Sequence, residues 1–377
     1  MLKVGITGQA GFVGTHLYNT LGLFPAKYSR IPFEDSYFQN REKLSAFLSS
    51  CDVIIHLAAV NRHGDPKYIY DTNISLVRQI IEVSESLNIL PHFLFSSSTQ
   101  EDRDNPYGRS KKKGRELFEK WSLNTGGRFT GLIIPNVFGP FGHPYYNSVV
   151  ATFCHQLSHY EESGIDVDGE LRLIHVSELV NFILDLLSTD IPDIEGLSSH
   201  VEVPHTAVIK VSELLEKIKR FRDQYFEKGM IPDLDNEFDR NLFNTFLTYI
   251  DHKSFYPFHL KQNEDERGTF VEILKLGSGG QVSFSTTKPG ITRGNHFHTR
   301  KAERFAVIKG RAKIEIRKLG SSDKLVFELD GASPSFVDMP VWYTHNITNI
   351  GNEDVYTIFW INEHFNPLDP DTFFEVV

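Results

Sequence analysis

The chain has 377 residues, more than one hydrophobic core usually supports, so we expect two domains. Apolar residues make up 40% of the sequence and charged residues 23%, which is typical of globular proteins and excludes a disordered or fibrous chain. The formal net charge of −10 argues against nucleic acid as a partner.

The sequence shows no targeting or membrane-spanning segment. The N-terminal stretch MLKVGITGQAGFVG lacks a long apolar core with a cleavage site, and no segment approaches the roughly 20 apolar residues that span a bilayer. Neither Cys51 nor Cys154 has a second cysteine nearby to form a zinc-finger or redox motif. We therefore expect a cytoplasmic protein with free thiols and no membrane partner.

The first half of the chain alternates short apolar runs with stretches of helical periodicity. Such alternation predicts a doubly wound parallel sheet of the Rossmann type. A further helix is predicted over residues 207–228. The expected strands lie within residues 2–8, 52–59, 92–98 and 129–136, and the expected helices within residues 14–21, 74–87 and 110–123.

The pattern changes near residue 250, where short β-rich segments punctuated by glycine, proline and asparagine begin. Regularly spaced short strands indicate a β-sandwich or a small barrel. The polar, proline-containing stretch at residues 248–262 is a reasonable linker. The sequence therefore predicts an α/β domain over residues 1–250 and an all-β domain over residues 251–377.

Three glycines, Gly8, Gly11 and Gly14, follow the first apolar run and open the first helix. A tight turn from strand to helix needs residues without Cβ, and the free N–H groups of the helix can bind a pyrophosphate. The alternative is a plain glycine turn. The strand–turn–helix context at the start of the chain favours a dinucleotide site.

Tyr107 and Lys111 lie four residues apart in a predicted helix and therefore share one face. A lysine ammonium beside a phenol favours the phenolate and lowers its pKa, so Tyr107 could protonate a carbonyl oxygen as a hydride arrives. On its own, such a pair is more often found at a surface. The upstream glycines and the serines at residues 96–98 favour a catalytic pair.

These features resemble the extended short-chain dehydrogenases/reductases that act on nucleotide sugars. The resemblance spans residues 1–190 and rests on TGxxGxxG at residues 7–14, HLAA at 56–59, YxxxK at 107–111 and PNVFGP at 135–140. It implies that Ser98, with Ser97 as the alternative, hydrogen-bonds the substrate oxygen. The cofactor-binding residues implied are Thr7, Gly8, Gly11, Phe12, Val13, Gly14, Leu57, Ala58, Ala59, Tyr107, Lys111, Pro135, Asn136 and Val137.

The end of the second strand governs the choice of cofactor. An acidic residue there would bind a ribose 2′-hydroxyl, whereas an arginine accommodates a 2′-phosphate. Arg30 precedes Glu34 and Asp35, which favours NADPH, although Arg30 as a solvated loop charge is the alternative.

In the second half, His296 and His298 share one face of a predicted strand, and neighbouring strands can bring Glu303 and His345 to it. Three imidazoles and one carboxylate suit a divalent transition metal such as zinc, iron, nickel or manganese. The spacing resembles the two cupin motifs, which implies a jelly-roll β-barrel. The first motif is complete, and in the second Trp342 replaces a glycine.

The stretches DERGTFVEI at residues 265–273 and QVSFSTTKPGITRGNHFH at 281–298 resemble the dTDP-sugar 3,5-epimerases. That resemblance implies that His296 is a proton-abstracting base and that Arg267 and Arg293 bind diphosphate or polarise the sugar ketone. A metal-bound imidazole has committed its lone pair, so the ligand and base roles of His296 compete.

Taken together, the two halves resemble the CapF-type bifunctional enzymes of capsular polysaccharide synthesis over essentially the whole chain. The resemblance implies a zinc-containing homodimer. It also implies C3 epimerisation of UDP-2-acetamido-2,6-dideoxy-β-L-arabino-4-hexulose, followed by NADPH reduction at C4 to UDP-2-acetamido-2,6-dideoxy-β-L-talose, on the route to UDP-N-acetyl-L-fucosamine. Epimerisation must come first, because the C4 ketone acidifies the C3 hydrogen. The alternatives are a single-activity reductase with a non-catalytic, dimerising cupin, and a redox sensor paired with a sugar-sensing cupin.

Overall fold

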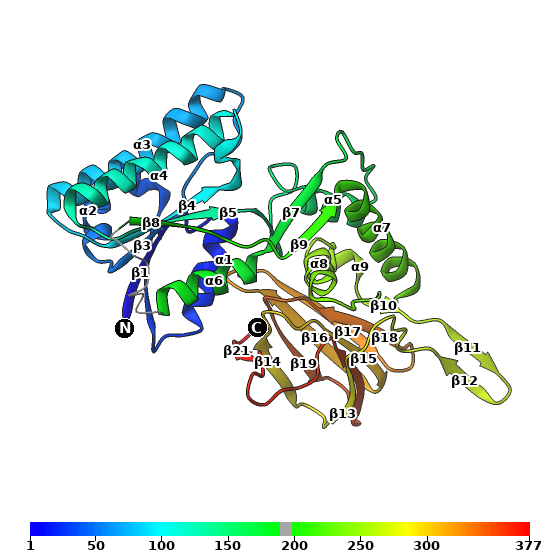
Figure 1. Cartoon of the computed structure of the whole chain (residues 1–377). Coiled ribbons are helices and arrows are strands. Elements are labelled where there is room, and N and C mark those ends of the chain that lie inside the picture. The colour runs from blue at the N-terminus through cyan, green and yellow to red at the C-terminus, as the bar shows by residue number, and fades with distance from the viewer. Residues whose placement is uncertain (189–197) are drawn as a thin grey trace. The chain divides into compact units, whose positions relative to one another are not determined.

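The computed structural model describes residues 1–188 and 198–377, which form two compact units (Figure 1). Unit 1 comprises Met1–Phe138, Gly142–Val149 and Gly169–Lys210. Unit 2 comprises Gly139–Phe141, Val150–Asp168 and Val211–Val377. Within the part of the chain that is described, no helix combines the length and the apolar character needed to cross a membrane.

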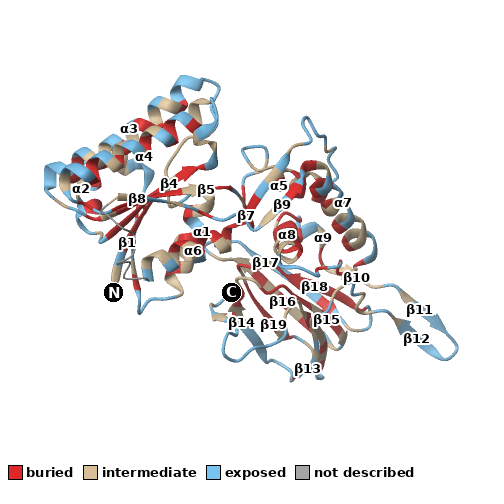
Figure 2. Ribbon diagram, viewed as in Figure 1, coloured by how far each residue is buried: buried red, intermediate tan, exposed pale blue. Residues whose placement is uncertain are grey.

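Unit 1 is built on a six-stranded parallel sheet in the order β2-β1-β3-β4-β5-β8, which confirms the Rossmann-type prediction. One apolar cluster packs α1 and α6 on one face of the sheet, and a second packs α2, α3 and α4 on the other (Figure 2). The strands are β1 (Leu2–Thr7), β2 (Tyr28–Ile31), β3 (Val53–His56), β4 (His92–Ser98), β5 (Phe129–Ile134) and β8 (Ser198–Glu202). The helices are α1 (Phe12–Gly22), α2 (Arg41–Ser49), α3 (Pro66–Leu87), α4 (Pro106–Thr125) and α6 (Val176–Ser188), with 3₁₀ turns η1 (Asp35–Gln39) and η2 (Thr99–Asp102).

A second, three-stranded sheet in unit 1 joins β6 (Asn136–Phe138), β7 (Glu170–His175) and β9 (Ala207–Lys210). The helix predicted over residues 207–228 is therefore wrong for its first four residues, and α7 covers only Val211–Lys228. The two β-branched residues in AVIK suit a strand, and β9 finds an antiparallel partner in β7. Pairing with a strand that is distant in the sequence therefore outweighs the helical periodicity at residues 207–210.

Unit 2 contains two five-stranded antiparallel sheets that enclose an apolar core, which confirms the all-β prediction for this part of the chain. The first has the order β10-β18-β15-β20-β13 and the second β17-β16-β19-β14-β21. The strands are β10 (Phe258–His259), β13 (Gln281–Thr287), β14 (Thr292–Phe297), β15 (Glu303–Lys309), β16 (Arg311–Lys318), β17 (Lys324–Asp330), β18 (Ser335–Met339), β19 (Tyr343–Asn349), β20 (Val355–Ile361) and β21 (Phe373–Phe374). A separate hairpin consists of β11 (Gln262–Asp265) and β12 (Gly268–Val271).

Unit 2 also contains helices that precede the barrel in the sequence. They are α5 (Val149–Ser158), α7, α8 (Glu237–Leu247) and α9 (His252–Phe255). The boundary predicted at residue 250 falls inside this unit, and the stretch at residues 248–262 includes α9 and the buried Tyr256. The contacts thus divide the chain at positions that differ from the predicted boundary, because the helices pack with the barrel that follows them.

Candidate functional site

The glycine-rich loop links β1 to α1 with very little space around it. Gly8 has a φ of +70°, and a Cβ at this position would lie 2.8 Å from the backbone nitrogen of Ala58. A Cβ on Gly14 would lie 2.2 Å from the carbonyl oxygen of Gly8. These close contacts require glycine, and they bring the N-terminus of α1 up to the end of the sheet.

A cavity of about 500 Å³ opens beside this loop. Its size and mixed polarity suit a cofactor or a small substrate. Thr7 lies behind the lining, where its hydroxyl contacts His56 Nδ1 at 2.6 Å and accepts a hydrogen bond from the Ala58 backbone. The predicted residues that line the cavity are Gly8, Gly11, Phe12, Val13, Gly14, Leu57, Ala59, Ser97, Ser98, Tyr107, Lys111, Pro135, Asn136 and Val137.

Arg30 does not line this cavity. Its guanidinium donates to the carbonyl oxygen of Tyr18 at 3.1 Å and stacks 4.4 Å from the centroid of the Tyr18 ring. The structure therefore places Arg30, the residue predicted to bind a 2′-phosphate, beside α1, where it is exposed on β2.

The cavity has further lining residues that motif reasoning missed. Several belong to the polar and aromatic stretch at residues 142–148, which Arg62 ties down by donating to the carbonyl oxygens of Tyr145 and Tyr146 at 2.7 and 3.2 Å. The only sequence signal was this composition directly after PNVFGP. The additional lining residues are Asn61, Ser96, Gln100, Ile134, Gly142, His143, Tyr146, Asn147, Ser148 and Leu179.

The structure brings Tyr107 and Lys111 together in this cavity on one face of α4. Lys111 donates from Nζ to the carbonyl oxygen of Ser96 at 2.8 Å and to its hydroxyl at 3.3 Å. Burial lowers the pKa of Lys111 to about 7, and burial followed by the charge of Tyr146 raises the pKa of Tyr107 to about 12. The predicted lowering of the Tyr107 pKa is thus outweighed by desolvation, which keeps the phenol protonated.

Ser98 and Ser97 differ in what their hydroxyls already do. Ser98 accepts from the backbone nitrogen of Gln100 at 3.2 Å, so its own proton stays available to a substrate oxygen. Ser97 donates to Glu101, which in turn pairs with Arg115 at 2.8 Å. The geometry therefore favours Ser98 as the hydrogen-bond donor to substrate.

The buried ammonium of Lys111 should make stability depend on pH. The unfolded chain keeps this proton up to an ordinary pKa of 10.5, whereas the folded protein releases it near pH 7. Between these values the unfolded chain binds more protons, so the stability of the unmodified protein rises with pH. Relative to Lys111→Met, it should gain up to about 1.4 kcal/mol per pH unit above pH 7.

Denaturant melts of both proteins at pH 6, 7, 8 and 9 measure this difference. The exposed neighbour Lys112, changed to Met, serves as the control. A constant difference between Lys111→Met and the unmodified protein across this range contradicts the prediction.

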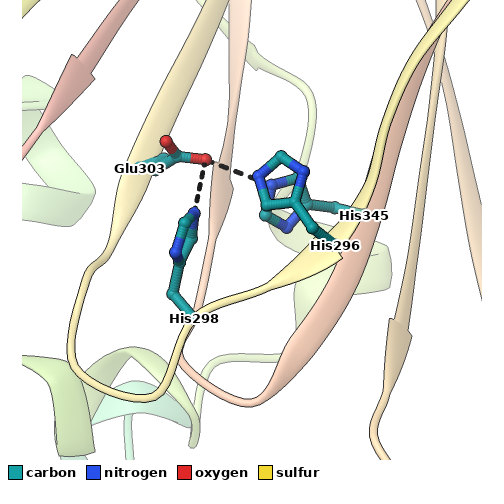
Figure 3. A group of neighbouring side chains, drawn as sticks. All are labelled: His296, His298, Glu303 and His345. Atoms are coloured by element: carbon teal, nitrogen blue, oxygen red, sulfur yellow. Dashed lines mark ion pairs between the residues drawn. The ribbon is translucent and has the colours of Figure 1, made fainter. Parts of the chain in front are cut away.

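The second candidate site lies between the two sheets of unit 2 (Figure 3). His296 and His345 face each other from β14 and β19, Glu303 begins β15, and His298 directly follows β14. A β-bulge at Asn295, whose φ is +58°, sets the register that places His296 opposite His345. The structure thus brings all four predicted metal ligands together, with one potential ligand atom from each lying within 4.8 Å of the others.

Hydrogen bonds fix the tautomers of two of these histidines. The Nδ1 of His298 donates to the carbonyl oxygen of Asp371, and that of His345 donates to the carbonyl oxygen of Tyr343 at 3.2 Å. Since a carbonyl can only accept, each Nδ1 carries the proton and each Nε2 presents its lone pair. These Nε2 atoms lie 3.4 and 3.1 Å from the same carboxylate oxygen of Glu303.

Three buried acceptors therefore face one another, without another hydrogen-bond partner among the described residues. A shared cation or a proton on an imidazole relieves this repulsion. Tetrahedral zinc, with bonds of about 2.0–2.2 Å to nitrogen and oxygen, needs ligand atoms roughly 3.3–3.5 Å apart. The two separations from Glu303 to His298 and His345, 3.4 and 3.1 Å, are close to this spacing. The donor set and geometry fit a divalent cation.

The charge states inside the cluster follow from burial and mutual contact. Burial, and then the neighbouring His345 and His298, lower the pKa of His296 to about 4, so this imidazole is neutral at pH 7. Burial also lowers the pKa of His298, but the hydrogen bond and charge of Glu303 outweigh it, and the net shift is upward. Burial raises the pKa of Glu303, but the hydrogen bonds and charges of His298 and His345 lower it by more, so the net shift is downward.

The two arginines predicted to bind substrate form their hydrogen bonds with residues outside this cluster. Arg267 occupies the turn of the β11–β12 hairpin, where its side chain is 89% exposed and pairs with Asp265. Figure 1 shows this hairpin extending away from the barrel. Arg293 is exposed on β14 and donates to the carbonyl oxygen of Thr286 at 3.2 Å.

Trp342, which replaces the glycine of the second cupin motif, has a left-handed backbone conformation that favours glycine. Its φ is +64°, its backbone nitrogen donates to the carbonyl oxygen of His298 at 2.7 Å, and its ring stacks on Phe297. The tryptophan therefore packs beside the cluster and leaves His345 in place.

Comparisons with known proteins match both parts of the chain to known families. Residues 4–194 match the NAD dependent epimerase/dehydratase family, and residues 263–373 match the polysaccharide biosynthesis C-terminal domain. The chain is 32% identical over 380 residues to the UDP-2-acetamido-2,6-beta-L-arabino-hexul-4-ose reductase of Pseudomonas aeruginosa, covering 99% of this chain and 98% of that protein.

Among solved structures, the capsular polysaccharide assembling protein CapF of Staphylococcus aureus is 34% identical with a TM-score of 0.63, and the match covers 100% of both chains. RMD from Pseudomonas aeruginosa, complexed with NADPH, is 20% identical with a TM-score of 0.52 over 59% of this chain and 83% of its own, a likeness of fold alone. The chain therefore belongs to the CapF-type family of nucleotide-sugar epimerases and reductases, in which an NAD dependent epimerase/dehydratase domain precedes a polysaccharide biosynthesis C-terminal domain.

Proposed function

We propose that this chain performs two successive reactions on one UDP-sugar. Unit 2 inverts C3 of UDP-2-acetamido-2,6-dideoxy-β-L-arabino-4-hexulose, and unit 1 then reduces C4 with NADPH. The product is UDP-2-acetamido-2,6-dideoxy-β-L-talose, on the route to UDP-N-acetyl-L-fucosamine for surface polysaccharide. The main support is that one chain carries both a tyrosine–lysine cavity and a cluster of three histidines and a glutamate. The Pseudomonas relative is named as a reductase of a UDP-hexulose of this kind.

In unit 1, the residues of the cavity suit reduction of a ketone. A bound nicotinamide would supply the hydride to C4, and the N-terminus of α1 would face its pyrophosphate. Tyr107 donates its proton to the C4 oxygen, and Ser98 donates a hydrogen bond to the same oxygen. The ammonium of Lys111, held by Ser96, stabilises the phenolate that remains.

In unit 2, the cluster suits exchange of a proton next to that ketone. The C4 carbonyl makes the C3 hydrogen acidic, and return of a proton to the opposite face of the carbon inverts the centre. A divalent cation, which we propose to be zinc, would be held by His296, His298, Glu303 and His345 and would supply positive charge beside the C4 oxygen. The neutral imidazole of His296 suits either a ligand or the base that removes the proton.

Our proposal of NADPH rests on Arg30, which lies exposed near the end of β2. Its guanidinium stacks on Tyr18 of α1, and the first acidic residue after this strand is Glu34. A KM for NADPH well below that for NADH supports this assignment, and the reverse order contradicts it.

We further propose that the chain forms a homodimer. β13 is the last strand of its sheet, and its apolar residues Val282 and Phe284 are 53% and 72% exposed. An apolar edge strand of this kind favours pairing with a second chain. Light scattering that gives twice the mass of one chain supports the dimer, and the mass of one chain contradicts it.

Product analysis tests the two-reaction proposal. The 4-keto-6-deoxy UDP-N-acetylhexosamine is incubated with the enzyme, with and without NADPH, and the products are identified by NMR. With NADPH, we expect a sugar reduced at C4 and inverted at C3. Without NADPH, we expect only the mixture of C3 epimers. A product reduced at C4 with its original C3 configuration contradicts the proposal.

A further inference from the structure

The last residues of the chain fold back beside the histidine cluster. β21 pairs with β14, so that Phe374 lies opposite His296 and Phe373 opposite Phe297. Just before β21 comes Asp371, which is only 3% exposed although it carries a carboxylate. A buried carboxylate is costly unless its oxygens are hydrogen-bonded, so its partners indicate what it stabilises.

The Asp371 carboxylate accepts hydrogen bonds from three consecutive backbone N–H groups and one hydroxyl. The backbone donors are Thr299 at 3.1 Å, Arg300 at 3.0 Å and Lys301 at 3.1 Å. The hydroxyl of Thr299 adds a contact of 2.6 Å. One side chain therefore fixes the backbone of the loop that runs from His298 towards Glu303.

The backbone of Asp371 acts on the cluster as well. Its carbonyl oxygen accepts a hydrogen bond from the Nδ1–H group of His298. This bond orients the ring and leaves the Nε2 lone pair facing Glu303. The residue holds a φ of +43°, a conformation that aspartate and asparagine tolerate better than most side chains. The backbone carbonyl of Asp371 thus orients the His298 imidazole, and its carboxylate holds the loop that follows.

We propose that Asp371 is a positioning residue for metal binding, which rests on the proposed function of the cluster as a metal site. His298 and Glu303 belong to opposite sides of the barrel, and the loop between them sets their separation. Because the loop and the His298 ring are already fixed, the side chains of the cluster are preorganised for the cation. Loss of the carboxylate leaves three backbone N–H groups without their acceptor, which loosens the loop and the position of the Asp371 backbone carbonyl that orients the His298 ring.

The test measures metal binding directly. Zinc is added to the purified full chain, and its affinity and its rate of release to excess chelator are compared among variants that melt cooperatively. Asp371→Asn keeps the size and the backbone tolerance of the residue but replaces one acceptor oxygen by a donor. We expect about 10- to 100-fold weaker zinc binding with faster release, together with an altered visible spectrum of the cobalt-substituted protein.

Two further variants keep the test decisive. Thr299→Ala removes a single hydrogen bond to Asp371 and should weaken binding by a smaller factor, which Thr299→Ser should restore. Asp369→Asn is the matched control, because this exposed carboxylate in the same tail pairs with the Arg300 guanidinium rather than with the loop backbone.

The outcomes separate this inference from the proposed function. If the unmodified protein binds no zinc, the metal part of the proposed function fails. If the unmodified protein binds zinc and Asp371→Asn binds and releases it equally well, the positioning role is overturned. Should Asp371→Asn fail to fold, unchanged affinity, release rate and cobalt spectrum in Thr299→Ala overturn it instead.

Discussion

Replacing Tyr107 with Phe is expected to abolish reduction of the 4-keto UDP-sugar while leaving proton exchange at C3 intact. The substitution keeps the ring and removes only the hydroxyl that protonates the C4 oxygen. Loss of a positioned general acid lowers rates by about 10²- to 10⁴-fold. NADPH oxidation, followed by absorbance, measures the first activity, and deuterium uptake at C3, followed by NMR, measures the second.

Tyr160→Phe is a suitable control, because this phenol is 76% exposed and does not line the cavity. It should oxidise NADPH at the rate of the unmodified protein. A Tyr107→Phe enzyme that keeps its reduction rate within a few-fold would remove the phenol from the reaction. Loss of C3 exchange in the same folded variant would instead argue against two separate sites.

Replacing His296 with Ala should have the opposite effect. The change removes an imidazole whose ring lies 4.5 Å from that of His345. We expect C3 exchange to fall by about 10²-fold or more, whether the imidazole acts as base or as ligand. NADPH oxidation should persist when the sugar supplied is already inverted at C3.

The zinc content of His296→Ala then separates the two roles of the imidazole. A variant that keeps its zinc but loses exchange identifies His296 as the base, and loss of both identifies it as a ligand. His259→Ala is the control, since this histidine is exposed on β10. Unimpaired exchange in His296→Ala contradicts our assignment of the reaction to this cluster.

Mixing the two variants offers an independent check on the order of the reactions. Tyr107→Phe should supply the inverted ketone that His296→Ala then reduces, so the mixture should form the final product that neither variant forms alone.

Sequence reasoning found the parts of both sites that short motifs encode. The turn at Gly8 and Gly14 is dictated by contacts within the loop and its adjacent strands, so glycine spacing predicted it well. Tyr107 and Lys111 are one helical turn apart, and their shared face follows from helix geometry. His296 and His298 are equally local, and the framing glycines indicated the barrel around them.

The failures of sequence reasoning concern contacts between distant segments. Asp371 lies 73 positions after His298, and only the pairing of β21 with β14 brings the two together. β9 becomes a strand because β7 offers it a partner. The charge of Arg30 was visible in the sequence, but its stacking on Tyr18 depends on the packing of α1 beside β2.

The pKa of Tyr107 shows the same limit in the chemistry of the site. A lysine four residues away predicted a lowered pKa, but burial of the phenol raises it. The depth of a side chain is a property of the folded unit and cannot be read from local spacing. The protonated phenol nevertheless suits the role of proton donor in reduction.

The measurement that bears most directly on this account is solvent isotope uptake without cofactor. The unmodified enzyme is incubated with the 4-keto-6-deoxy UDP-N-acetylhexosamine in deuterated buffer, with no NADPH present, and the sugar is examined by NMR. We predict deuterium at C3. A sugar that stays fully protonated at C3, while added NADPH is still oxidised, would contradict the account and leave a single-activity reductase with a non-catalytic second unit.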